Sequence, residues 1–75
     1  MDPATRVIEL RERAALEGDE SLRSEVEKEN HPFLLAVGRA AGIQGYAKGK
    51  PLRKDGVVGL LVEKLMGEAA GLEVA

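Results

Sequence analysis

The sequence predicts an all-α fold, a small bundle of three to four helices built around a helix–extended loop–helix core. The first observation behind this prediction is composition. Leu, Ala, Glu, Lys and Arg are abundant, whereas the 75 residues include one Phe, one Tyr and no Trp, which favours helices over strands. The second is that apolar residues recur three and four positions apart in several segments. The third is that Gly and Pro separate these segments, at positions typical of helix ends.

A first helix is expected from about Pro3 to Glu17. Asp2 can cap this helix, and Pro3 suits its first turn because proline lacks the backbone N–H that would be unpaired there. Gly18 then ends the helix. Its buried line is predicted from apolar residues at helical spacing, with an adjoining apolar line beside it: Val7, Leu10 and Ala14, then Ile8 and Ala15.

A second, shorter helix is expected to follow, with Asp19 and Ser21 as candidate caps. Leu22 and Val26 lie four residues apart in an otherwise charged run. The apolar stripe of this helix is therefore narrow and is expected to anchor little. We expect the charged side chains around it to face solvent.

The third helix is expected from about Phe33 to Ala41, and its mostly apolar sequence predicts the centre of the core. Pro32 marks its start, and Gly42 its end in the left-handed conformation that glycine tolerates. Gly38 inside a helix costs about 1 kcal/mol relative to Ala, so we expect another element to pack closely against it. The core residues expected here are Phe33, Leu34, Val37, Ala40 and Ala41.

The fourth helix is expected from about Arg53 to Met66. Its predicted core line is strongly periodic and consists of Val57, Val58, Leu61, Val62 and Leu65. Gly56 and Gly59 weaken this helix. Their presence predicts a close approach of the backbone, either to the third helix or to a ligand.

Charge divides the chain into unlike halves. Residues 1–30 carry five basic and nine acidic side chains, and residues 31–66 carry six basic and two acidic ones, although the whole chain has a net charge of only −2. This division predicts an anionic partner for the second half. The expected organisation is an acidic N-terminal helical segment (1–30), a helix–extended loop–helix module (31–67) and a disordered tail (68–75).

Basic side chains clustered around the loop and the start of the fourth helix, residues 45–54, form the best candidate site. The cluster contains Lys48, Lys50, Arg53 and Lys54, and Arg39 can join it from the end of the facing helix. A helix that begins here points unpaired backbone N–H groups, left unobstructed by Gly56, towards a phosphate oxygen. Asp55 opposes this charge. Tyr46 either covers the gap between the third and fourth helices or is exposed and stacks on a base.

An enzymatic function is not expected, and neither is a cofactor or a metal. The chain has no cysteine and a single histidine, His31, which lacks partners for nucleophilic or metal chemistry and is expected to be a cap or turn residue. Gly45 and Gly49 are too close together for a phosphate-binding loop, and Pro51 stands where that motif needs a hydroxyl. No apolar run reaches the roughly 18 residues that cross a bilayer, so we expect a cytoplasmic protein without membrane contact.

The segment Ala41 to Lys48, AGIQGYAK, followed by Leu52 to Asp55 and an apolar helix, resembles the helical N-terminal domain of transcription terminator Rho. It is more distantly similar to the SAP family of nucleic-acid-binding domains. This resemblance implies a helix–extended loop–helix fold and an attachment module for DNA or RNA, with Gly49 to Pro51 as an insertion. The basic positions that match are Lys48, Arg53 and Lys54. The order of helix, Gly-rich loop and short helix is also similar to peripheral subunit-binding domains, which bind protein.

These observations predict a non-catalytic nucleic-acid-binding module that contacts the phosphates of DNA or RNA through residues 45–54. The alternative is a protein-interaction module. It would be either similar to the peripheral subunit-binding domains or a homodimer or larger structural assembly, including one in a virion or phage, formed through residues 1–30. A third interpretation is that the acidic helices imitate nucleic acid and inhibit a basic partner.

Overall fold

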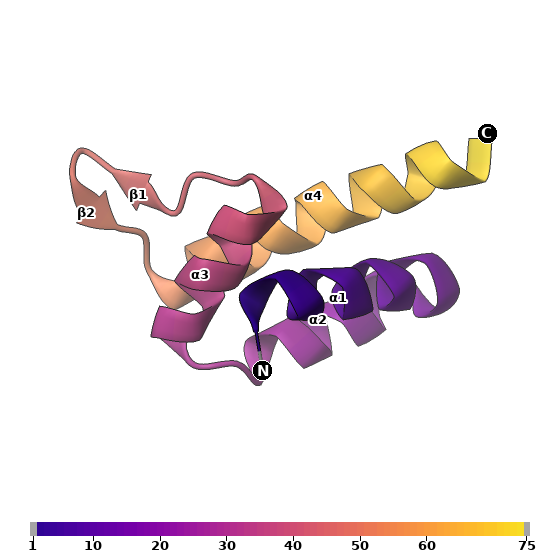
Figure 1. Cartoon of the computed structure of the whole chain (residues 1–75), viewed down its shortest axis with the longest axis horizontal. Coiled ribbons are helices and arrows are strands. Elements are labelled where there is room, and N and C mark those ends of the chain that lie inside the picture. Colours follow the sequence, from indigo (N-terminus) through magenta and orange to yellow (C-terminus); the bar gives the residue numbers. More distant parts are fainter. Residues whose placement is uncertain (1, 75) are drawn as a thin grey trace.

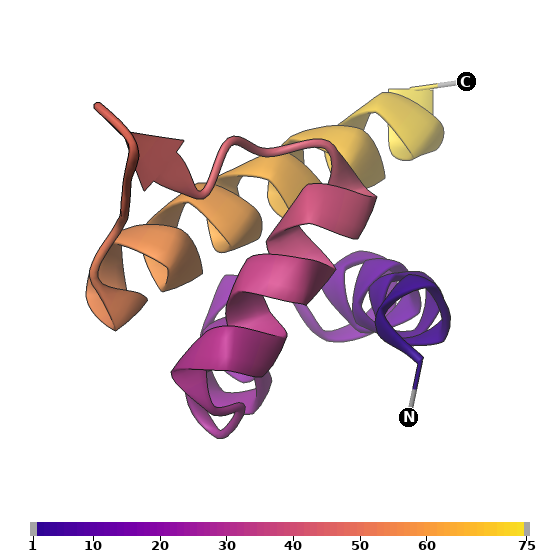
Figure 2. The same ribbon diagram turned by 60° about the vertical axis from the view of Figure 1, so that its left-hand side comes forward.

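The computed structural model describes residues 2–74, with side chains described as far as Gly71. This part of the chain forms helices α1 (Pro3–Glu17), α2 (Asp19–Glu27), α3 (His31–Ala41) and α4 (Lys54–Val74), with strands β1 (Tyr46–Ala47) and β2 (Lys50–Pro51) between α3 and α4. The predicted all-α bundle is confirmed. In Figure 1, α1 and α2 lie side by side, and the β1–β2 hairpin projects from one end of the bundle. Figure 2 shows α3 crossing α4.

One hydrophobic core joins all four helices, and α1 packs against each of the other three. The charge boundary near residue 30 is therefore not a boundary in the packing. Most predicted core residues are confirmed as buried: Val7, Leu10, Ala14, Leu22, Val26, Leu34, Val37, Ala41, Val57, Val58, Leu61, Val62 and Leu65. Since Leu22 and Val26 are both fully buried, the narrow stripe of α2 anchors that helix better than expected.

Three residues on the predicted apolar lines of α1 and α3 are exposed rather than buried. Each of them lies on the side of its helix that has no packing partner. Ile8 is 56% exposed on α1, and Ala15 is also exposed. On α3, Ala40 is exposed, whereas Phe33 is partly buried against the core. An apolar line on the solvent side of α1 and another on the outer side of α3 are thus left without a helical partner.

The ends of α1 and α3 follow from capping chemistry. The Asp2 carboxylate accepts a hydrogen bond from the backbone N–H of Thr5 at 3.2 Å, and the side chain of Asn30 accepts one from Phe33 at 3.0 Å. Gly42 ends α3 with φ of 91°. Its N–H donates to the carbonyl of Arg39, and the next N–H donates to that of Gly38. This pair of bonds is the Schellman motif, which satisfies carbonyls that the helix end leaves unpaired.

The expected close approach of another segment is confirmed at Gly38, but the one expected at Gly56 and Gly59 of α4 is wrong. A Cβ on Gly38 would lie 2.9 Å from the side chain of Ile43, which folds back over the helix end. At Gly59 the same atom would meet nothing within 4 Å, and at Gly56 it would only touch Leu52 at 3.8 Å. The glycines of α4 therefore mark no packing constraint.

A β-hairpin replaces the simple extended loop that the sequence predicts. Lys48 and Gly49 both have positive φ, 54° and 77°, which reverses the chain in two residues and matches the twist of the paired strands. Tyr46 then pairs with Pro51. The pairing continues at the base, where the Leu52 N–H donates to the carbonyl of Gly45 at 2.8 Å. Gly49, Lys50 and Pro51, which were expected to be an insertion, thus form half of the turn and the second strand.

The expectation of a disordered tail is wrong for residues 68–74, which continue α4. Ala69 is only 4% exposed and belongs to the core cluster. Glu68 accepts a hydrogen bond at 3.0 Å from Arg11 of α1. Contact with α1 therefore holds this part of α4, and Ala75 lies outside the described residues. None of the described helices is both long and apolar enough to span a membrane.

Candidate nucleic-acid interface

Ion pairing divides the cationic side chains into two groups at residue 31. Every cation before that residue pairs with a carboxylate; these are Arg6, Arg11, Arg13, Arg23 and Lys28. No ion pair among the described residues involves a cation after it: Arg39, Lys48, Lys50, Arg53, Lys54 and Lys64. Among the described residues, no carboxylate of the chain therefore neutralises these six cations.

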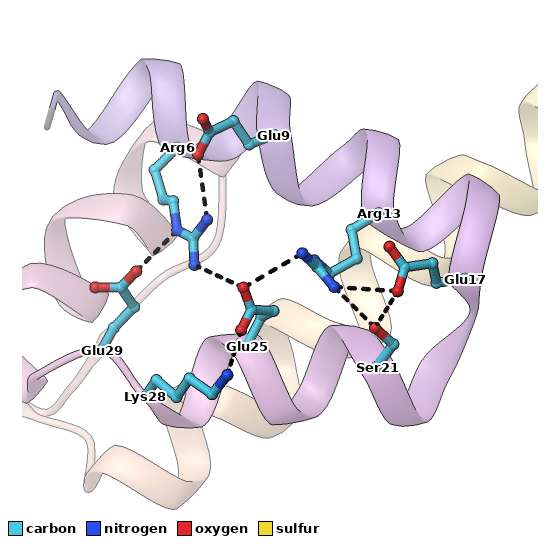
Figure 3. A network of polar contacts seen from close by, with 8 residues as sticks. All are labelled: Arg6, Glu9, Arg13, Glu17, Ser21, Glu25, Lys28 and Glu29. Atoms are coloured by element: carbon cyan, nitrogen blue, oxygen red, sulfur yellow. Dashed lines mark hydrogen bonds and ion pairs between the residues drawn. The ribbon is translucent and has the colours of Figure 1, made fainter.

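Figure 3 shows how the first half neutralises its own charge between α1 and α2. Arg6, whose side chain is 14% exposed, donates from Nε to Glu29 at 2.8 Å and lies 3.9 Å from Glu25. Arg13 lies 3.4 Å from Glu25, and Lys28 lies 2.9 Å from it. The hydrogen bond from Lys28 and the nearby positive charges together lower the pKa of the Glu25 carboxyl.

The hairpin presents cations on an exposed projection. Lys48 lies at the turn, Lys50 lies on β2, and Arg53 precedes α4. All three are exposed, as is Arg39 in the last turn of α3. The structure thus places Lys48, Lys50 and Arg53 along the hairpin and its junction with α4, whereas Arg39 lies at the opposite end of α3 from the His31 contact with the hairpin.

Lys54 and Lys64 lie away from the hairpin. The Nζ of Lys54 donates to the carbonyl of Glu27 at 2.8 Å, where α2 ends and its dipole favours a cation. The Nζ of Lys64 lies beside the C-terminal end of α3, 3.8 Å from where a Cβ on Gly42 would sit. Lys54, one of the predicted site residues, is thus placed against α2.

The first turn of α4 is less open to an anion than the sequence predicts. The Asp55 carboxylate accepts a hydrogen bond from the backbone N–H of Gly56 at 3.1 Å. A carboxylate of the chain itself therefore uses one of the donors that were expected to face a phosphate. Cationic side chains, rather than the helix start, provide the positive surface.

His31 fixes the base of the hairpin. Its Nε2 lies 2.7 Å from the carbonyl oxygen of Leu52, and because a carbonyl only accepts, Nε2 carries the proton and donates it. His31 is the first residue of α3, so this bond joins the start of α3 to the residue that ends the hairpin. No group of three metal-ligating side chains is found in the part of the chain that the structure describes.

Tyr46 lies beside α3 rather than over the gap between α3 and α4. Tyr46 is 52% exposed. It borders a groove whose lining comes from α3 and from the segment that follows it, with no residue from α4. The main lining residues are Leu35, Ala36, Arg39, Ala40, Ile43 and Tyr46.

The groove was not foreseen in the sequence, although a signal was present. His31 and Arg39 are the only polar side chains of α3, so the helix is apolar on both sides. A helix that is apolar all round predicts either complete burial or a second contact surface. In a chain this short complete burial is hard to achieve.

Comparisons of this chain with protein-family models, with curated proteins and with solved structures find no match.

Proposed function

We propose that this chain is a non-catalytic nucleic-acid-binding module that contacts phosphates through the hairpin, its junction with α4 and the last turn of α3. The cations that would make these contacts are Arg39, Lys48, Lys50 and Arg53. The segregation of ion pairs carries the proposal. A cation already paired to a carboxylate gains little from a phosphate, whereas an exposed cation without such a partner gains a full charge-assisted contact.

The shape of the hairpin supports the same proposal. Both strands are exposed along their length, so the turn can approach a nucleic-acid backbone without interference from the acidic helices. Lys48 lies at the tip and Arg53 at the base. The site therefore presents a short row of positive charge, which matches a backbone that carries a regular series of phosphates.

A protein-interaction role is the second candidate, and the exposed apolar residues of α1 favour it. Leu16 is 83% exposed and Ile8 is 56% exposed, so α1 presents two large apolar side chains that a partner could cover. An assembly formed through α1 would leave the hairpin open. The two roles are therefore compatible in one molecule.

The experiment that tests the proposed function compares two lysines, neither of which forms an ion pair in the described part of the chain. Fluorescence anisotropy measures binding of a labelled oligonucleotide at low salt to the wild type, to Lys48→Gln and to Lys64→Gln. We expect Lys48→Gln to weaken binding about threefold to tenfold and Lys64→Gln to leave it unchanged. Equal effects of the two substitutions, or no binding by the wild type, would contradict the proposal.

A further inference from the structure

We infer that the ligand of this site is single-stranded nucleic acid, DNA or RNA, and that one unpaired base lies in the groove between α3 and Tyr46. The inference rests on the proposed function, which itself requires only phosphate contacts. Its additional content is the groove. Phosphate contacts alone would not distinguish a single strand from a duplex.

The groove is formed where the extended segment from Ile43 to Tyr46 packs on α3. A Cβ on Gly45 would lie 2.9 Å from Cδ2 of Leu35, so the backbone of this segment lies directly on the outer side of α3. Ile43 closes the end of the groove by folding over Gly38. The floor is left to the small side chains Ala36 and Ala40.

Two planar groups border this apolar floor. The Tyr46 ring is half exposed, and the Arg39 guanidinium is exposed in the last turn of α3. Aromatic rings and guanidinium planes are the protein groups on which unstacked bases stack. Gln44 adds an amide at the rim that can both donate and accept hydrogen bonds.

Charge favours an anionic occupant with an apolar face. None of the described lining residues of the groove is acidic, and Lys48 and Lys50 lie on the hairpin that continues from Tyr46. A base in the groove would place the flanking phosphates near these lysines. A duplex offers phosphates but keeps its bases stacked and paired, so it would leave the groove empty.

The test uses four labelled probes of equal length: single-stranded DNA, single-stranded RNA, duplex DNA, and an abasic single strand that keeps the phosphates without the bases. Anisotropy at fixed low salt is expected to give about tenfold tighter binding for at least one of the two normal single strands than for the abasic strand. The DNA and RNA arms show which of the two chemistries the groove accepts. Tyr46→Ala is expected to abolish the difference, and Tyr46→Phe to retain it.

A second variant tests the groove without altering the hairpin. Ala36→Glu adds a carboxylate to an exposed position on the groove floor. It is expected to reduce single-strand binding at least about tenfold while the abasic strand loses less, because only the base enters the groove. Thermal melting of each variant confirms that it folds.

The outcomes separate this inference from the proposed function. If the abasic strand and the duplex bind as tightly as the single strands, phosphate binding stands and the base-binding groove is rejected. If no probe binds at low salt, both are rejected. If an acidic amphipathic peptide binds in a Tyr46-dependent manner and the bases add nothing, the groove belongs to a protein helix and the inference is overturned.

Discussion

The Nε2–H of His31 donates to the carbonyl oxygen of Leu52 at 2.7 Å, and this bond fastens the hairpin to the start of α3. His31 and Leu52 are separated by 21 positions in sequence. The contact lies where the chain leaves the hairpin for α4. The His31 imidazole therefore helps to set the orientation of the cationic projection relative to the bundle, together with the packing of Gly45 on Leu35.

His31→Ala is expected to loosen the hairpin without unfolding the bundle. The substitution leaves the Leu52 carbonyl without its partner, which costs about 1 kcal/mol of unfolding free energy for a half-buried bond. Hydrogen exchange should show the effect locally, as faster exchange of the Leu52 amide that pairs with Gly45. An unchanged exchange rate at Leu52 would mean that the hairpin holds its place independently of His31.

Lys48→Asn is expected to stabilise the fold and weaken nucleic-acid binding at the same time. Lys48 has a φ of 54°, and asparagine adopts this conformation more readily than lysine, especially before glycine in a two-residue hairpin turn. The gain in unfolding free energy should be about 0.5 kcal/mol, measured by chemical denaturation. The loss of one charge should reduce affinity about threefold to tenfold.

The unfolding free energy is expected to rise while the affinity falls, and this separates the two effects. A variant that binds less but melts at a higher temperature has not lost binding through unfolding. Lys48→Gly provides the matched control, since it removes the charge and relieves the backbone by a different route. Tighter binding by either variant would show that Lys48 does not contact the ligand.

Arg6→Met is expected to destabilise the α1–α2 pair. Arg6 is nearly buried and bonds Glu29 at 2.8 Å, so its removal leaves partly buried carboxylates uncompensated and should cost about 1–3 kcal/mol. Arg23→Met is the control, because Arg23 is 46% exposed and lies 4.0 Å from Asp19. An exposed pair of this kind is worth at most about 0.5 kcal/mol. Equal losses in thermal or chemical denaturation would contradict the assigned roles.

Glu25 is expected to contribute to acid sensitivity. The Lys28 hydrogen bond and the nearby arginines lower the pKa of the Glu25 carboxyl from its ordinary value of 4.5. Its contribution to stability is therefore present above that pH and is lost as the pH falls through the lowered pKa. Denaturation curves recorded over this acid range should show a smaller decline for Glu25→Gln than for the wild type. Glu20→Gln, at an exposed position, should decline as the wild type does.

The C-terminal part of α4 offers a comparison of adjacent alanines. Ala69 is 4% exposed and Ala70 is exposed. Ala69→Asp should cost at least about 2 kcal/mol because it places a charge in the core. Ala70→Asp should remain within about 0.5 kcal/mol of the wild type. Similar stabilities for the two variants would indicate that this end of α4 does not pack against the bundle.

The helices could be predicted because local chemistry determines them. Asp2 and Asn30 cap helices that proline helps to start, and Gly42 ends α3 through a motif that needs positive φ. The hairpin could not be predicted in the same way. Lysine before glycine is a weak turn signal compared with asparagine, so Lys48 gave no indication that the loop pairs with itself.

Tertiary contacts account for most of the remaining differences. The tail sequence is rich in Ala and Gly and predicts fraying, but Arg11 and the core contact of Ala69 extend the helix. The segregation of charge was visible in the sequence. Its consequence depends on the antiparallel α1–α2 arrangement, which brings Arg6 to a glutamate 23 residues away. Lys54 lies outside the predicted cluster because its Nζ donates to a backbone carbonyl of α2. Sequence spacing does not reveal this contact.

The salt dependence of oligonucleotide binding tests the role of the hairpin cations most directly. If Arg39, Lys48, Lys50 and Arg53 each contact a phosphate, a plot of log K against log salt should have a slope of about −2.8 on a single strand and about −3.6 on a duplex. Simultaneous change of Lys48, Lys50 and Arg53 to Gln should reduce the slope to about −0.7 on the single strand. A slope that this triple substitution leaves unchanged, or an absence of binding by the wild type at low salt, would contradict a phosphate-binding role for the hairpin.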